Sequence, residues 1–285
     1  MTLSLSFNIA SLRAQTQLKK TNQELSKTFE RLSSGLRINR ASDDPAGLAL
    51  ADALRADTKI ATVAIRNAND GISLTNIADS ALEEISNILN RMAELAEQSA
   101  NGAVTNSQRS ALSSEFTALA SEIERIAKTT EFNDLKLLSN SSDVSIQVGL
   151  DGTSNSVITI NSVLGTLNSL NLGDSGGILI YSVIDSTTAL SQTAAQNALS
   201  AVNNAITTLG ITRGLLGASQ SRLEFAVNNL TVARENFAAA ESAIRDADIA
   251  QEVANMVRLQ VLQQSVTAVL AQANLQPQLV LKLLQ

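Results

Sequence analysis

Proline is almost absent from this chain, and its scarcity constrains the fold more than any other feature of the sequence. The 285 residues contain only Pro45 and Pro277, so more than two hundred consecutive residues have none. Proline breaks helices because it lacks the backbone N–H and clashes with the preceding turn. The apolar share is 44% but the aromatic share only 2%, which suits packed helices better than a β-sandwich. We therefore predict a mainly α fold, a long antiparallel helical rod or coiled coil.

The segment Leu32–Ala49, LSSGLRINRASDDPAGLA, contains both a helix end and a helix start. Gly35 can adopt the left-handed conformation that ends a helix. Asp44 can accept hydrogen bonds from free amides at a helix start, and Pro45 fits the first helical position. We interpret Asp44 and Pro45 as a helix-start hinge. We prefer a simple cap to a metal or acid–base pair at Asp43 and Asp44, because no other cluster of ligand-type residues lies nearby in the sequence.

Apolar residues spaced three or four apart predict the first helices. One covers residues 3–34 and a second runs from Pro45 to about Ser99. Thr105 and Gln108 have the spacing of a capping box and predict the start of a third helix. Because the intervening loop is short, the second and third helices are expected to be antiparallel neighbours.

The chain after the third helix changes character. Residues 144–160 alternate apolar and polar side chains around Asp-Gly, which predicts a small β-hairpin. Residues 186–244 again show helical spacing. Gly210, Gly214 and Gly217 predict a weak point or bend in that helix.

The last helix is apolar around most of its circumference, so it must be buried on several sides. The N-terminal helix has one narrow apolar stripe, and we expect the two terminal helices to pair. That pairing cannot satisfy the last helix, so we expect frayed ends in the free monomer and further burial against other copies or another protein. The predicted polymerisation core comprises Leu5, Ile9, Leu12, Leu25, Phe29, Leu32, Val253, Met256, Leu259, Val266 and Leu270.

Composition excludes several classes of function. The chain has no Cys and no His, which removes thiol chemistry, disulfides, His or Cys metal sites and Ser-His-Asp catalysis. We expect no enzyme activity, catalytic residue, cofactor or metal. Residues 1–40 hold seven basic and two acidic residues, but they lack the interleaved aromatics of a nucleic-acid arm. No segment is long enough for membrane insertion, and the first residues form a poor secretory signal.

Three separated motifs resemble bacterial flagellin. They are LSKTFERLSSGLRINRASDDPAGLALADALRA at 25–56, NRMAELAEQSANG at 90–102 and RDADIAQEVANMVRLQVLQQSVTAVLAQANLQPQLVLKLLQ at 245–285. The resemblance covers roughly 1–160 and 185–285 and is that of a minimal flagellin without the large inserted outer domains. It implies a structural subunit that polymerises into the extracellular flagellar filament, exported by the flagellar type III apparatus without a cleaved signal peptide.

The resemblance also implies a domain organisation. Residues 1–35 and 248–285 would form an inner coiled-coil domain of paired termini. Connectors at 36–44 and about 239–247 would lead to an outer rod domain at 45–238, with its hairpin at about 144–160.

The family further implies partners. These are other copies of the chain, an export chaperone that covers the C-terminal helix, and the hook-associated and cap proteins. Flagellins of several bacteria are also recognised by a host Toll-like receptor. The matching residues here are Arg91, Leu95 and Glu122. The alternative interpretation is that Leu95 belongs to the inner stripe and that Arg91 and Glu122 form a solvated ion pair.

The sequence leaves two alternative functions open. A hook–filament junction protein shares the terminal design, although the C-terminal motif AQANLQPQLVLKLLQ favours flagellin itself. A secreted helical translocator also uses amphipathic helices, but it would need a longer continuous apolar segment.

Overall fold

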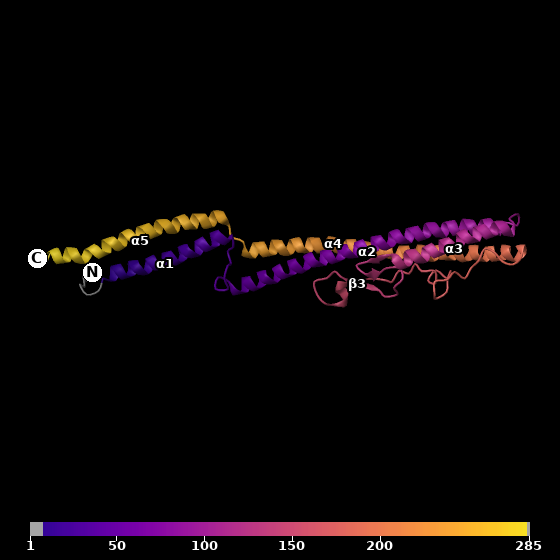
Figure 1. Cartoon of the computed structure of the whole chain (residues 1–285). Coiled ribbons are helices and arrows are strands. Elements are labelled where there is room, and N and C mark those ends of the chain that lie inside the picture. The colour runs from indigo at the N-terminus through magenta and orange to yellow at the C-terminus, as the bar shows by residue number, and fades with distance from the viewer. Residues whose placement is uncertain (1–7, 284–285) are drawn as a thin grey trace. The chain divides into compact units, whose positions relative to one another are not determined.

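The chain forms two compact units, each built from packed helices. The computed structural model describes residues 8–283, with side chains as far as Leu275. Met1–Thr58 and Glu235–Gln285 form one unit, here called the terminal unit, and Lys59–Arg234 form the central unit. The division falls inside two long helices, α2 (Pro45–Ala100) and α4 (Thr188–Arg245) (Figure 1).

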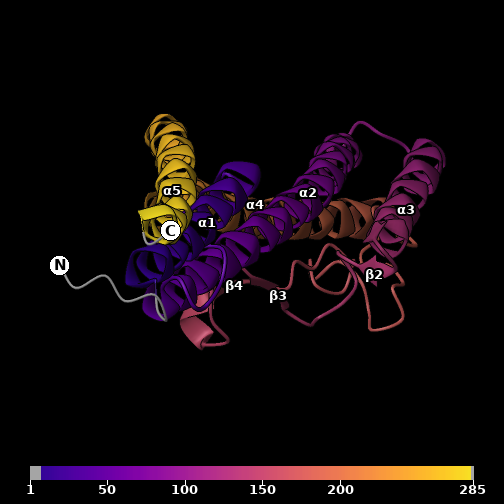
Figure 2. The ribbon, with the colours of Figure 1, turned by 90° about the vertical axis from the view of Figure 1, so that its left-hand side faces the viewer.

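In the terminal unit, helix α1 (Ile9–Ser34) lies antiparallel to helix α5 (Ile249–Leu283). The Asn8 side chain at the start of α1 donates a hydrogen bond to the Ala273 carbonyl at 2.7 Å. Toward the other end of the pair, Arg31 and Glu252 form an ion pair at 3.2 Å. The two helices lie side by side in both ribbon views (Figures 1 and 2). The predicted pairing of the terminal helices is confirmed.

The face of α1 that contacts α5 differs from the predicted apolar stripe. Its buried and half-buried residues alternate steps of three and four, the spacing of a coiled-coil seam. They are Ser11, Ala14, Leu18, Thr21, Leu25, Thr28 and Leu32. Small and polar side chains fill four of these positions, so a search for apolar residues alone could not find the seam.

The α5 side of the seam follows the same spacing, through Glu252, Met256, Leu259, Gln263, Val266, Leu270 and Ala273. Gln263 donates to the Asn22 side chain across the seam at 2.8 Å. Leu259 and Ala273 are buried, and the remaining members are half-buried. The seam is therefore a shallow coiled-coil contact with polar cross-links.

Two short connectors join the helices of the terminal unit and pair with each other. Gly35 ends α1 in the left-handed conformation (φ 72°), as predicted. Leu36 forms a β-bridge with Asp246, and the Ala247 amide donates to the Gly35 carbonyl at 2.9 Å. The second connector is shorter than predicted, because α4 stays helical to Arg245 and residues 239–245 belong to it.

The central unit is built on α2 from Lys59 onward, α3 (Asn106–Thr129) and α4 as far as Arg234. The capping box of Thr105 and Gln108 is present at the start of α3. The three helices share one continuous core of fully buried side chains. Among them are Leu82, Ile85, Leu89, Met92, Leu95, Phe116, Ile123 and Leu209.

Two hairpins lie in the segment between α3 and α4. The predicted hairpin is confirmed: β3 (Val144–Gln147) pairs antiparallel with β4 (Val157–Ile160), with Val144 opposite Ile160, and the 3-10 turn η1 (Ser154–Ser156) precedes β4. A smaller hairpin of β1 (Glu131–Phe132) and β2 (Leu135–Lys136) was not predicted. Its turn places Asn133 and Asp134 at positive φ, so the Asn-Asp pair was the available signal.

The predicted bend in α4 is wrong. The helix runs unbroken through Gly210, Gly214 and Gly217, and a Cβ at any of the three would meet no atom within 4 Å. Leu209 and Leu216, on the neighbouring turns, are buried in the core of the central unit, and this packing outweighs the weak helix propensity of glycine.

Candidate functional site

The free side of α5 is a long uncharged face. Seven large apolar residues of this helix are exposed: Ile249, Val253, Val257, Val261, Leu262, Val269 and Leu275. Between Val253 and Leu275 the only charged side chain is Arg258. Val253, Val257 and Val261, spaced four residues apart, lie on the side away from α1, and exposed apolar residues grouped in this way mark a candidate interaction site.

The predicted polymerisation residues divide between this free surface and the seam. Leu25, Leu32, Met256, Leu259, Val266 and Leu270 lie in the seam between α1 and α5. Ile9, Leu12, Phe29 and Val253 are exposed, Leu12 to 63%. Leu5 lies outside the described residues. The set therefore mixes residues that pair the helices of one chain with residues left for another partner.

The helix-start hinge has the predicted geometry. The Asp44 carboxylate accepts a hydrogen bond from the Gly47 amide at 2.9 Å, and the Asp44 carbonyl accepts one from Leu48 at 3.0 Å. Pro45 is the first residue of α2. A Cβ at Gly47 would lie 2.4 Å from an Asp44 carboxylate oxygen and 2.8 Å from Ile38 Cδ1, so the cap leaves no room for a side chain there.

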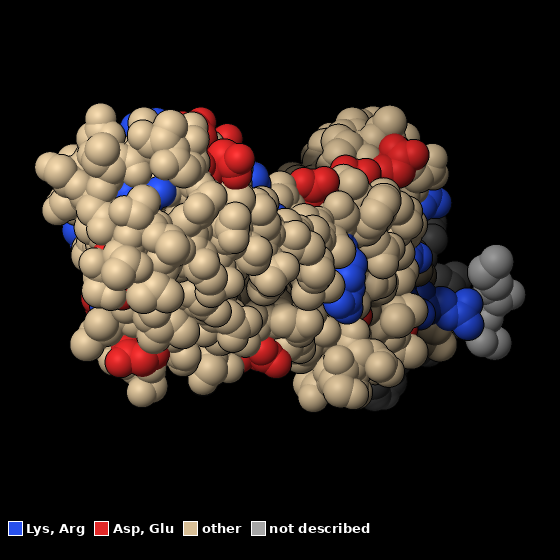
Figure 3. Space-filling view, turned by 90° about the vertical axis from the view of Figure 1, so that its right-hand side faces the viewer, with Lys and Arg blue, Asp and Glu red and all other residues tan. Residues whose placement is uncertain are grey.

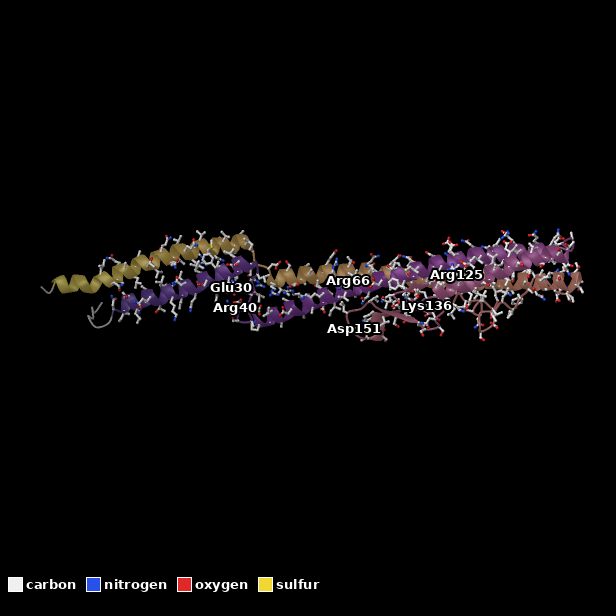
Figure 4. The ribbon with its side chains drawn as sticks, viewed as in Figure 1. Glu30, Arg40, Arg66, Arg125, Lys136 and Asp151 are labelled. Atoms are coloured by element: carbon white, nitrogen blue, oxygen red, sulfur yellow. The ribbon has the colours of Figure 1, made fainter. Side chains whose placement is uncertain are left out.

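Asp43 does not share the cap with Asp44; it holds the connector. Its carboxylate accepts hydrogen bonds from the amides of Arg40 (3.1 Å) and Asn39 (3.3 Å). These two bonds, that of Arg40 first, hold the pKa of Asp43 below its ordinary value. Glu30 of α1 accepts from Arg40 Nε at 2.7 Å and from the Asn39 side chain at 3.0 Å (Figure 4). The connector is thus tied to the end of α1 by backbone and side-chain contacts.

Arg91 and Glu122, the two charged residues of the predicted receptor site, are exposed but do not pair with each other. Arg91 on α2 contacts Glu94 at 2.8 Å and Glu115 of α3 at 2.9 Å. Glu122 pairs with Arg125 at 2.5 Å, and this contact lowers the pKa of Glu122. The interpretation of Arg91 and Glu122 as one solvated ion pair is wrong.

Leu95, the third residue of that site, has a packing role. Its side chain is 1% exposed within the core of the central unit. Its position on the inner stripe of α2 is confirmed. A partner at this surface would therefore contact Arg91 and Glu122 rather than the Leu95 side chain.

Sequence reasoning missed Arg109, a fully buried arginine at the junction of three helix ends. Its guanidinium donates to the carbonyls of Ser99 (2.8 Å), in the last turn of α2, and of Asn101 (2.9 Å), just after that turn. It also donates to the Asn106 side chain (3.2 Å) and the Thr188 carbonyl (3.4 Å) at the start of α4. A cation at the C-terminus of a helix is favourable. Charged residues are seldom buried, so the sequence carried no signal for this one.

The described residues include neither a candidate metal site nor a candidate membrane-spanning helix. No group of three or more acidic residues among them could hold a metal ion. None of the helices within the described range is long and apolar enough to cross a membrane. Figure 3, which faces the end of the central unit where α2 ends and α4 begins, shows a surface that is mostly uncharged. This agrees with α4, where no charged residue occurs from Thr188 to Thr212.

Comparisons with known proteins point in one direction. The model of the bacterial flagellin N-terminal helical region matches residues 5–143, and that of the C-terminal helical region matches residues 199–284. A flagellin of Halalkalibacterium halodurans is 42% identical, with 99% of each chain covered. The flagellar filament 33 kDa core protein of Treponema phagedenis is 37% identical, again with 99% of each covered.

A solved structure also shares the fold. The structure of a putative flagellar hook-associated protein from Vibrio parahaemolyticus superposes with a TM-score of 0.59, covering 72% of this chain and all of that one. Its sequence identity is 17%, so this likeness concerns the fold alone.

Proposed function

Because the chain belongs to the bacterial flagellin family, we propose that it is the subunit that polymerises into the extracellular flagellar filament. The curated relatives that match over nearly its whole length are flagellins and a flagellar filament core protein. The chain has the character of a structural protein.

The observation that carries this proposal is the free face of α5. Val253, Val257 and Val261 point away from the α1 seam and are 40%, 50% and 56% exposed. Within one chain, α1 covers the opposite side of the helix only. Burial of apolar surface yields roughly 25 cal/mol for each Å² removed from water, so repeated contacts along this face favour assembly. We therefore assign the face to contacts with neighbouring copies.

Removal of the face tests the function. We expect a chain lacking residues 250–285 to keep a helical central unit, because that unit has its own core, and to form no filaments. Electron microscopy and sedimentation measure the polymer, and circular dichroism measures the helices. Filaments from the shortened protein would contradict the assignment.

A single substitution gives a sharper version. Val261→Asp places a charge on the free face without touching the seam, and we expect a folded monomer that fails to sediment. Val261→Leu keeps the face apolar and is the matched control, which should assemble like wild type. Equal assembly of both variants would show that Val261 stays exposed to water in the polymer.

Export and end-binding partners extend the proposal. Before assembly the free face of α5 would need cover, and we infer that a flagellar export chaperone supplies it. Hook-associated and cap proteins would meet the same surfaces at the two filament ends. Co-purification of the chaperone with the whole chain, and its loss on removal of residues 250–285, is the expected result. Retention on the shortened chain would refute the chaperone site.

The receptor proposal rests on Arg91 and Glu122. Both side chains are exposed on the central unit, on α2 and α3. We expect Arg91→Ala to weaken the response of Toll-like-receptor reporter cells to monomer while leaving its helicity intact. Loss of the Glu115 contact alone should cost little stability, because solvent screens ion pairs between exposed side chains. Equal potency of wild type and Arg91→Ala would reject this site and leave the filament proposal unaffected.

A further inference from the structure

Helix α4 carries a second heptad-spaced face within the central unit, and that face is exposed. The inner face, through Val202, Leu209, Leu216 and Leu223, is buried in the core. The outer face steps by four, three and seven residues through Ile211, Leu215, Ala218, Phe225 and Val232. All five are exposed, Ile211 to 63% and Phe225 to 74%. We call these five residues the α4 ridge.

Heptad spacing on an exposed helix face indicates a second packing partner. Side chains at this spacing form the knobs of helix–helix contacts, and large aromatic knobs are frequent anchors of protein interfaces. The Phe225 ring contributes little to the stability of the monomer, because most of its surface stays in contact with water there. The ridge therefore indicates contact with something outside the chain.

An apolar groove lies elsewhere on the same unit. Ile60, Val63 and Ala64 of α2 form one side, and Gln147 and Gly149 of the β3–β4 hairpin form the other. Its volume is about 270 Å³, and Ile60 and Val63 are 41% and 45% exposed inside it. This space is sufficient for a large side chain.

The ridge and the groove belong to different elements of one chain. A contact between two unlike patches is heterologous, so each copy can present a ridge to one neighbour and a groove to another, and the series continues without closing. That is the kind of contact a helical polymer requires. A partner with only a ridge or only a groove would end the series.

Charge also favours a second copy as the occupant. Arg222 and Asn229 are polar and lie at the same spacing between the residues of the ridge, and Arg222 is the charged one of the two. The hairpin beside the groove contributes the exposed carboxylate of Asp151. Hydrogen bonds from Ser156 and Thr153 hold the pKa of Asp151 below its ordinary value, so it is charged near neutral pH. Lys59 is the only charged residue that lines the groove itself, and its charge has the same sign as that of Arg222.

We propose that the α4 ridge of one subunit docks into the α2–hairpin groove of the next, with Phe225 as the central anchor. This inference rests on the proposed function and adds a specific lateral contact made by the central unit. It is independent of the α5 face, which lies in the terminal unit.

Disulfide trapping tests the contact directly, because the chain has no cysteine of its own. Phe225→Cys and Val63→Cys are made in separate chains, one of them tagged to change its size, then mixed and assembled on wild-type seeds. Oxidation should give a linked species of the two different chains, since disulfides form only between Cβ atoms that lie close together. Asn203→Cys, also exposed on α4 but 22 residues before Phe225 and so about 33 Å along the helix, is the matched control and should stay unlinked to Val63→Cys.

A second measurement does not depend on the cysteines. Phe225→Ala should raise the critical concentration for polymerisation roughly tenfold, as expected for loss of an interface anchor. The far-UV spectrum and melting temperature of the monomer should not change, because the ring is exposed there. Asn203→Ala should assemble like wild type.

The outcomes separate the two proposals. If wild-type filaments form, yet Phe225→Ala assembles at the wild-type concentration and the cysteine pair stays unlinked, the ridge contact is wrong and the filament function stands. If wild-type protein forms no filaments at all, both are wrong. Linked chains together with a raised critical concentration establish the contact.

Discussion

Asp44 is the residue whose role can be tested with the smallest change. Its carboxylate caps α2 through the Gly47 amide at 2.9 Å. Replacement by Ala removes that acceptor, and we expect the terminal unit to lose about 1 kcal/mol, the usual cost of a lost helix cap. Filaments of Asp44→Ala should melt earlier, because the connector and the start of α2 are then held less firmly.

The control for this prediction is Asp44→Asn, which keeps a side-chain oxygen and should cost little. Thermal unfolding of the monomer and melting of the filament are the measurements. If Asp44→Ala and Asp44→Asn melt together with wild type, the cap does not stabilise the hinge.

The roles of single residues could be predicted from the sequence where the residue acts on the backbone within a few positions of itself. Gly35, Asp44 and Thr105 all act within a few residues of themselves, through φ angle or capping bonds, so local sequence predicts them. Arg109 could not be predicted in the same way. Its acceptors come from the end of α2 and the start of α4, and only the folded chain brings them together.

The junction of helix ends around Arg109 gives a prediction for the elements of the central unit. Arg109→Met fills a similar volume but leaves the carbonyls of Ser99 and Asn101 without this donor. Leaving a buried acceptor unpaired costs about 1–3 kcal/mol, so we expect a clear loss in the free energy of unfolding of the central unit. Arg109→Lys keeps the charge but loses the forked donor geometry, so its free energy of unfolding should lie between those of wild type and Arg109→Met.

Chemical denaturation of the three proteins measures this order. Hydrogen exchange at the last turn of α2 should rise most in Arg109→Met. If Arg109→Met were as stable as wild type, the free-energy cost of desolvating the buried cation would equal the stabilisation from its hydrogen bonds.

The helices themselves were predictable, but not all of their packing faces. Long apolar periodicity predicted the helices at 45–99 and 186–244 within one or two residues of their observed ends. The seam of α1 was mistaken because Ser11, Thr21 and Thr28 lie in it while Ile9 and Leu12 face water. An apolar stripe predicts the packing face of a helix correctly only when a single partner buries all the apolar residues. In α1, Ile9 and Leu12 are not buried by α5.

The two units of the molecule differ in how completely they are packed. The central unit holds large side chains at 0–1% exposure, including Leu82, Leu89 and Phe116. In the α1–α5 seam the buried residues of α1 are Ser11, Ala14, Thr21 and Thr28, at 2–7% exposure, and most of the larger residues are only half-buried. Buried apolar area sets most of the stability, so the terminal unit should open first.

We therefore expect the monomer to unfold in two steps. Tyr181 is the single tyrosine and the chain has no tryptophan, so its fluorescence reports on the central unit, against whose core it packs. Circular dichroism reports on all helices. On heating, helical signal from α1 and α5 should fall before Tyr181 fluorescence changes, and removal of residues 250–285 should abolish that first step.

In the filament, contacts between copies stabilise the terminal unit by mass action, so the two signals should change together at a higher temperature. Coincident transitions in the monomer would contradict this, because they would mean that the shallow seam is as stable as the central core.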